Sequence, residues 1–276
     1  MGDSDSGYQL GTGIGEDEVA RLEAQGAAIA PATRMIFAEA GIRPGMRVLD
    51  LGCGAGDVTF VVADVVGPDG SVVGVDRSPD ALARARLRAG QRGLTQVQFV
   101  EGDIHDPAPG GPFDAIVDRL TLWAVPDPAA MLRRQATVLR AGGLVVPVEV
   151  DLSPMRWLPE IQLGTQVKSW LVEGFARAGL VMLGSRLWAI VQEAGLRPLG
   201  MMGVQPHFGP DDPVGIAFLV GAIRVAAPLI AGTGVATAEE IGMETFEQRL
   251  RDQGEKAQAV GATYMLLSAW ATTSPE

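Results

Sequence analysis

A short apolar strand that runs directly into a glycine-rich loop and then into a helix is the feature that most constrains the fold of this chain. Residues 48–60 read VLDLGCGAGDVTF, in which the glycines are Gly52, Gly54 and Gly56. Glycine adopts positive φ readily and has no Cβ, so such a loop turns sharply and brings its backbone N–H groups close to a ligand. These N–H groups lie at the beginning of a helix, where they are free to donate. The pattern predicts a ligand-binding loop after the first strand of an α/β fold.

The residue three positions after the second glycine distinguishes two kinds of ligand. A dinucleotide-binding loop requires Gly or Ala there, because the strand and helix pack closely around a pyrophosphate. Here the residue is Asp57, whose carboxylate would repel a diphosphate but tolerates a ligand with an ammonium group. The loop therefore disfavours a nicotinamide-dependent oxidoreductase. It resembles motif I of the class I S-adenosylmethionine-dependent methyltransferases.

Three more strands are expected downstream, each ending in a residue that can bind a ligand. We expect them at residues 72–76, 97–104 and 113–119. The first ends in Asp76, twenty residues after the last loop glycine, and an acid there can accept from both hydroxyls of a ribose. The other two bring Asp103 and Arg119 to the ends of their strands. Four such strands in this order support the resemblance more strongly than the glycine loop alone.

The remaining chain continues as repeated strand and helix units, with strands expected at 144–150, 196–204 and 262–271. This alternation indicates a parallel sheet. The resemblance implies an α/β, Rossmann-like, doubly wound sheet of seven mostly parallel strands with helical lid insertions, and an antiparallel last strand. We expect a single domain over 1–276, made of an N-terminal helical segment (1–40), a cofactor-binding half (41–150), lid insertions (151–175 and 205–259) and the rest of the sheet (183–204 and 260–272).

Local signals place the helix ends. Polar caps followed by proline or a capping box predict helices after Ser78, Asp127, Asp212 and Thr237. The helix that follows Asp127 is expected to reach Arg140. Near the N-terminus, apolar residues at helical spacing through 19–29 predict one helix, and a second is expected from Pro31 to Gly41. The arginines of the helix expected after Ser78 flank an apolar stripe and are interpreted as a solvated face: Arg84, Arg86, Arg88 and Arg92.

The resemblance assigns roles at the methionine and ribose end of the cofactor. The three loop glycines would line this portion, with Cys53 as a small residue that fits within the loop. Asp50 would fix the loop or bind the ammonium group through water, or would be an ordinary strand-end cap. Asp76 would hold the ribose diol, the alternative being an acid that only caps a turn. Arg119 could pair with the ligand carboxylate, or with Asp118 or Asp127 as a structural partner.

The same resemblance assigns the adenine end. Arg77 would lie beside the adenine, and the Gly102-Asp103 pair would end the third strand against it. Asp103 would accept from the adenine amino group, and Ile104 would donate its backbone N–H. The alternative for Asp103 is a loop cap.

Three further residues complete the expected cofactor site. Asp118 lies at the end of the fourth strand, which contacts the methionine portion in such folds. Trp123 would shield the sulfonium by cation–π attraction or line the pocket, or would be a core residue. Tyr8 belongs to a segment that would close over the pocket.

A general base is required only if the acceptor is a hydroxyl or an aromatic carbon, since the sulfonium is already activated and alignment and desolvation do most of the work. The candidate bases are His207, which follows the sixth strand, and Asp151, at the end of the fifth. A loop histidine is the alternative for the first. His105 is interpreted as structural or cofactor-lining.

Composition narrows the partners. The 276-residue chain carries a formal charge of −11, which disfavours nucleic acid and anionic membranes and favours a small-molecule substrate. A single cysteine and no basic leader at the start predict a cytoplasmic protein. The apolar window 213–231 contains Arg224 and Pro228, which argues against a membrane span. No residues have metal-ligand spacing, so no metal is expected.

The sequence therefore predicts a methyltransferase that uses S-adenosyl-L-methionine, releases S-adenosyl-L-homocysteine and modifies a small apolar or aromatic acceptor at carbon, nitrogen or oxygen. Bacterial natural-product enzymes of secondary metabolism are the group it resembles. A homo-oligomer through the lid helices is expected. The alternative is an S-adenosylmethionine-binding cyclase or a non-catalytic protein of the same fold.

Overall fold

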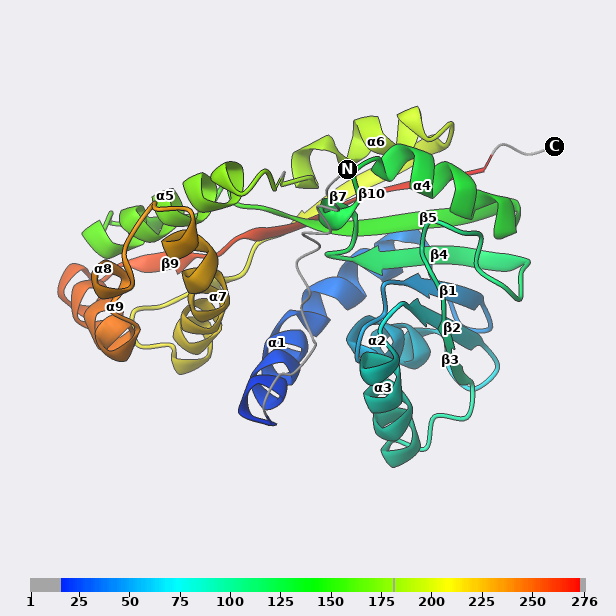
Figure 1. Cartoon of the computed structure of the whole chain (residues 1–276), viewed down its shortest axis with the longest axis horizontal. Coiled ribbons are helices and arrows are strands. Elements are labelled where there is room, and N and C mark those ends of the chain that lie inside the picture. The colour runs from blue at the N-terminus through cyan, green and yellow to red at the C-terminus, as the bar shows by residue number, and fades with distance from the viewer. Residues whose placement is uncertain (1–15, 181, 274–276) are drawn as a thin grey trace, which may run out of the picture. The chain divides into compact units, whose positions relative to one another are not determined.

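The computed structural model describes residues 16–180 and 182–273, with side chains from residue 26 onwards (Figure 1). The chain forms two compact units. The first contains residues up to 149, together with 186–202 and 268 onwards. The second contains 150–185 and 203–267. Three strands, β5, β7 and β10, run from one unit into the other.

A seven-stranded sheet forms the centre of the first unit, with the strand order β3-β2-β1-β4-β5-β10-β7. The strands are β1 (Arg47–Leu51), β2 (Ser71–Asp76), β3 (Val97–Glu101), β4 (Phe113–Arg119), β5 (Leu139–Asp151), β7 (Arg197–Val204) and β10 (Met265–Thr272). The pairs from β3 to β5 are parallel. At the end of β10, Thr272 Oγ1 donates to the carbonyl of Gly143 near the start of β5 at 3.0 Å, so β10 runs antiparallel to β5. The predicted fold class is confirmed.

Helix α1 (Glu16–Ala40) precedes the first strand. The helices between strands of this sheet are α2 (Asp57–Val66), α3 (Pro79–Gln91), α4 (Pro128–Gln135) and α6 (Leu187–Glu193), with short 3-10 turns η1 (Leu122–Ala124), η2 (Ala136–Val138) and η3 (Gly184–Arg186). The predicted caps are present. Ser78 Oγ accepts from the N–H of Ala81 at 3.3 Å, and Asp127 Oδ1 accepts from the N–H of Ala130 at 2.9 Å. The sheet order reverses between β1 and β4, which is where open α/β sheets bind ligands.

Two helix predictions were wrong. α1 is one continuous helix through Pro31, where two helices were expected. α4 ends at Gln135 and does not reach Arg140, because Leu139 already pairs with Phe113 of β4. The pairing of β4 with β5 is irregular between this point and the pair Ala115 and Leu144. The fifth strand expected at 144–150 is therefore the regularly paired part of the longer strand β5.

The second unit consists of α5 (Gln162–Arg177), α7 (Pro213–Gly232), α8 (Ala238–Ile241), α9 (Met243–Ala257) and an antiparallel sheet of β6 (Arg156–Leu158), β9 (Val260–Ala262) and β8 (His207–Phe208). Both stretches expected as insertions therefore contribute to one unit. The expected last strand is divided, since Val260–Ala262 joins the small sheet.

Among the described residues, α7 is the helix that by length and composition could cross a membrane. One such helix is weak evidence, because core helices of soluble proteins have the same composition. In this unit α7 packs against α5 and α9. It also carries Arg224 in its middle. Its predicted Asp212 cap is present, and so is the Thr237 capping box of α8.

Candidate functional site

In the glycine loop between β1 and α2, Gly52 packs tightly against Thr121, and Gly54 has open space beside it. Gly52 has φ +65°, and a Cβ there would lie 2.7 Å from the side chain of Thr121. Gly54 has φ +50°, and no atom lies within 4 Å of where its Cβ would be. Only glycine fits the first position. The second combines a turn conformation with room for a ligand to approach the backbone.

Asp76 at the end of β2 connects this loop to α3. Its Oδ2 accepts from the N–H of Gly54 at 2.8 Å, and its Oδ1 accepts from the N–H of Ser78 at 2.9 Å. The carboxylate is half-buried. Each carboxylate oxygen has further acceptor capacity, so Asp76 can hold the loop and still accept from a ligand hydroxyl.

Asp50 lies beneath the loop and is almost fully buried, with 1% of its surface exposed. Thr59 Oγ1 of α2 donates to its Oδ2 at 2.5 Å. Its Oδ1 has no hydrogen-bond partner among the described residues. Burial raises the pKa of Asp50 to about 7, against the opposing effects of Thr59 and of the Arg119 charge. The orphaned oxygen is an available acceptor at the methionine end of the expected site.

The turn after β4 forms the other wall of the loop. Leu120 has φ +59°, a left-handed conformation that is rare for a residue with a side chain and is often found at functional sites. Trp123 Nε1 donates to the carbonyl of Leu120 at 2.7 Å. Thr121 Oγ1 donates to the carbonyl of Leu51 at 3.2 Å. The turn is thus attached to the end of β1.

Arg119 and Asp118 lie on opposite faces of β4, because adjacent residues of a strand alternate. Arg119 Nη1 donates to Thr33 Oγ1 of α1 at 2.9 Å, a partner that was not among those expected. Asp118 is fully buried, and neither of its oxygens has a hydrogen-bond partner among the described residues. Burial, then the nearby Glu149 and Asp50, hold the pKa of Asp118 well above its usual range. Asp118 can therefore meet a ligand through its backbone only.

The expected adenine end is more exposed. The N–H of His105 donates to Asp103 Oδ1 at 2.8 Å, and the His105 ring Nδ1 lies at the same distance from that oxygen. These contacts lower the pKa of Asp103. Gly102 donates its N–H to the carbonyl of Asp76 at 3.0 Å, which places the third strand end beside the second. Arg77 is exposed, and Ile104 is half-buried with its carbonyl bonded to Gln135 Nε2.

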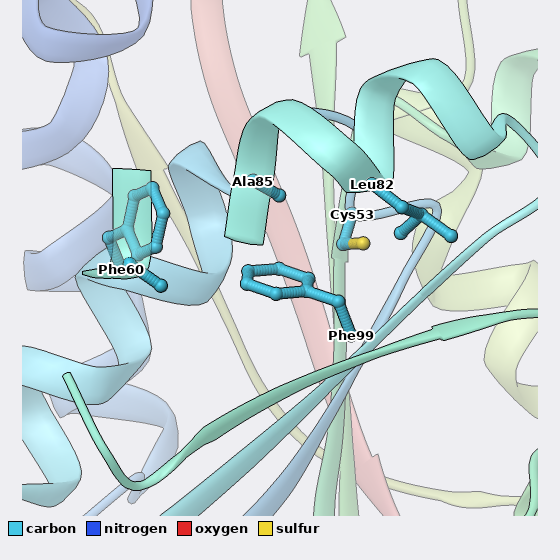
Figure 2. Packing of buried hydrophobic residues seen from close by; sticks show 6 residues of the cluster. Cys53, Phe60, Leu82, Ala85 and Phe99 are labelled. Carbon is cyan, nitrogen blue, oxygen red and sulfur yellow. The ribbon is translucent and has the colours of Figure 1, made fainter. Parts of the chain in front are cut away.

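Cys53 belongs to the loop by its backbone and to the core by its side chain. Its N–H donates to the carbonyl of Val75 at 3.0 Å. Figure 2 shows its sulfur among the side chains of Phe60, Leu82, Ala85 and Phe99, from α2, α3 and β3. Burial raises the pKa of the thiol. Cys53 therefore contributes loop shape and packing.

The interpretation of the α3 arginines as a solvated face holds for Arg86 and Arg92, which are exposed, but not for Arg88. Arg88 Nη1 donates to the carbonyl of Ala55 at 2.7 Å, and its Nη2 donates to Asp57 Oδ1 at 2.8 Å. Arg86 donates to the carbonyl of Phe99, and Arg92 pairs with Asp64. The buried alanines of α3 could have predicted this contact from the sequence. Their small side chains let α3 lie close enough for Arg88 to reach the glycine loop.

The two candidate bases lie in the second unit. Asp151 is half-buried, and its Oδ1 accepts from the N–H of Ser153 at 2.8 Å. His207 is exposed at the start of β8, with Nδ1 3.0 Å from the carbonyl of Gln205. Tyr8 lies outside the described residues. Among the residues described, no group of three or more His, Cys, Asp or Glu could hold a metal ion.

The residues present fit S-adenosylmethionine. The open space at Gly54, the orphaned Asp50 oxygen and the Asp76 carboxylate lie at adjacent strand ends of one sheet. They suit a ligand with an ammonium group and a ribose.

Comparison with known proteins agrees with this geometry. A family model described as a methyltransferase domain matches residues 42–194. Nocamycin O-methyltransferase of Saccharothrix syringae is 34% identical over 63% of this chain and 60% of the relative. Aklanonic acid methyltransferase DauC of Streptomyces sp. strain C5 is 36% identical over 37% of this chain and 46% of the relative. The chain thus spans about half the length of the curated relatives it matches.

Solved structures show the same fold. A SAM-dependent methyltransferase from Aquifex aeolicus has a TM-score of 0.52 and 15% identity, with 87% of this chain and 88% of that chain covered. The cyclase SpnF has a TM-score of 0.55 and 21% identity, with 90% and 81% covered.

Proposed function

Since the chain belongs to the methyltransferase domain family, we propose that it transfers a methyl group from S-adenosyl-L-methionine to a small acceptor and releases S-adenosyl-L-homocysteine. The observation that carries this proposal is the glycine loop, with its open approach at Gly54 and its attachment to Asp76. Two matching relatives, named nocamycin O-methyltransferase and aklanonic acid methyltransferase, support a small-molecule acceptor in secondary metabolism.

The proposed cofactor contacts follow the order of the strand ends. The loop amides from Gly52 to Gly56 bind the methionine and ribose portion. Asp76 accepts from the ribose hydroxyls, and Asp103 accepts from the adenine amino group. Asp50 fixes the loop or binds the ammonium group through water, and Arg119 donates to the carboxylate.

When bound, the cofactor supplies an activated methyl group. The protein's contribution is to align the acceptor and exclude water. Asp151 and His207 are the proposed bases for an acceptor that must lose a proton, and an amine acceptor requires neither.

An apolar or aromatic acceptor is proposed from the side chains of the second unit. The rings of Phe218 and Tyr264 contact each other there in a tilted arrangement, with ring centroids 5.3 Å apart. Trp157 is buried in the same unit. Aromatic surfaces of this kind favour a planar apolar ligand.

We also propose a cytoplasmic location, a homo-oligomer formed through the helices of the second unit, and no nucleic-acid or membrane partner. The formal charge of −11 supports the last point. Size-exclusion chromatography with light scattering tests the oligomer, and a single-chain mass contradicts it.

The direct test of activity measures S-adenosylhomocysteine formed from S-adenosylmethionine with a panel of phenols, indoles and polyketide-like acceptors. Formation that depends on acceptor and enzyme supports the proposal. Calorimetric binding of S-adenosylhomocysteine is measured in parallel, with NAD as the comparison ligand. Tight binding without turnover across the panel favours the cyclase or non-catalytic alternative, since the fold is shared with a cyclase.

A further inference from the structure

Two fully buried carboxyl groups lie behind the turn that follows β4. Asp118 of β4 is paired in register with Pro147 of β5, and Glu149 lies two residues further along β5. Side chains two residues apart share a face of a strand, so Asp118 and Glu149 point to the same side of the sheet. Both have no exposed surface.

Glu149 is attached directly to the turn. Its Oε1 accepts from the N–H of Leu122, the first residue of η1, at 2.8 Å. The amides of Leu122, Trp123 and Thr121 each stabilise its charged form. Three consecutive amides directed at one carboxyl form an anion-binding turn. Thr121 is also the residue that closes against Gly52, so the carboxyl supports the wall of the candidate cofactor site.

The other three oxygens of the two carboxyl groups accept no hydrogen bond from the described residues. They are Glu149 Oε2 and both oxygens of Asp118. Burial raises the pKa of Glu149 to about 8 and that of Asp118 well above its usual range. Asp50 is the other titratable group that raises the pKa of Asp118, and Arg119 faces Asp50. The pair therefore retains at least one proton at neutral pH.

We propose that Glu149 is a positioning residue for the cofactor site, and that a proton held by Glu149 and Asp118 keeps the turn of residues 121–124 in its ligand-binding shape. This inference rests on the proposed function. A singly protonated pair supports the turn without repulsion. When both groups are charged, the cost of burying two charges, together with their repulsion, separates them and loosens the turn.

The sign of the pH dependence follows from the direction of the pKa shifts. A carboxyl whose pKa is raised in the folded state stabilises that state below its unfolded pKa, and the contribution is lost as pH rises through the folded pKa. The support of the turn should therefore weaken as pH rises towards about 8 and stay level above that value. The affinity for S-adenosylhomocysteine should fall with it.

The test is calorimetric titration of the full chain with S-adenosylhomocysteine, from about pH 6.5 to about pH 8.5. The wild-type affinity is expected to fall by about threefold or more over this range. Glu149→Gln retains an acceptor for Leu122 but cannot ionise, so its affinity should match the wild type at the lower pH and fall less than the wild type as the pH rises. Asp118→Asn removes the repulsion, and its affinity should also fall less. The ligand and Asp50, whose pKa is about 7, titrate in all three proteins, so their contribution cancels when the profiles are compared.

Glu149→Ala leaves the turn amides without an acceptor and should weaken binding by about tenfold or more at every pH. Glu193→Ala, an exposed glutamate on α6, is the matched control and should bind like the wild type. A folded Glu149→Ala variant with wild-type affinity overturns the inference, and so does a Glu149→Gln variant that keeps the wild-type pH profile. If Glu149→Ala does not fold, the Glu149→Gln profile decides. Wild-type protein that binds no S-adenosylhomocysteine contradicts the proposed function itself.

Discussion

At the scale of single residues, Gly54 offers the sharpest separation of ligand binding from stability. Gly54→Val should abolish S-adenosylhomocysteine binding, because a branched side chain would occupy the open space where the ligand approaches. The left-handed backbone should also lower the free energy of unfolding by about 1–2 kcal/mol. Gly93 has φ +66° and the same open surroundings in a loop after α3. Gly93→Val is therefore the control for backbone strain alone. Equal S-adenosylhomocysteine binding by both variants would mean that the glycine loop does not contact the ligand.

Asp76→Ala removes the proposed acceptor of the ribose hydroxyls and the partner of the Gly54 N–H. Each charge-assisted hydrogen bond contributes about 1.5–3 kcal/mol, so affinity for S-adenosylhomocysteine should fall by at least about tenfold. Calorimetry on protein checked by circular dichroism measures this. Asp80→Ala, in the exposed first turn of α3, should bind normally. A folded Asp76→Ala protein with unchanged affinity would remove this carboxylate from the site.

Asp50 predicts a pH dependence of stability. Its pKa is raised from 3.8 to about 7 by burial. A raised pKa means that stability is fully present below the unfolded value and is lost as pH rises to about 7. Asp50→Asn cannot ionise, so its free energy of unfolding should decline less between pH 5 and pH 8, by about 1–3 kcal/mol. Urea unfolding at both pH values measures this, and parallel declines would contradict it.

At the scale of elements, α3 and the glycine loop are joined by Arg88. Arg88→Ala breaks its bonds to Ala55 and Asp57, so we expect a loss of about 1–3 kcal/mol in unfolding free energy and weaker cofactor binding. Arg84→Ala on the same helix is the control. Denaturant unfolding and calorimetry give both quantities. Equal effects of the two variants would mean that Arg88 also belongs to the solvated face.

Element boundaries were predicted well where a local signal determines them. β4 begins and ends where expected, and the Ser78 cap and Thr237 capping box are present. Errors arose where tertiary contacts override local signals. Leu139 leaves the helix pattern because it pairs with β4, and Pro31 is accommodated inside α1.

At the scale of the whole molecule, the proposed bases lie in the second unit and the proposed cofactor contacts lie in the first. If the acceptor must lose a proton, His207→Ala or Asp151→Asn should lower kcat by about 10²–10⁴-fold with little change in cofactor affinity. Steady-state kinetics with the identified acceptor measure this. Asp211→Asn, exposed in the same unit, is the control. Full rates for both variants would leave alignment and desolvation as the only contributions.

The sequence by itself determined the family, the fold class and the residues at the ends of the first four strands. These depend on short-range patterns, namely a glycine loop after an apolar strand and acids at fixed spacing. The placement of Asp76 beside Gly54 follows from that pattern and from the parallel register of β1 and β2.

Only the tertiary structure decided what the buried charges do. Asp118 and Glu149 are far apart in sequence, and neither the pairing of their strands in register nor the loss of solvent around them is visible locally. The same is true of Arg88, whose role depends on the distance between α3 and the loop. Electrostatic roles require burial and neighbours, and those are produced by packing between distant segments.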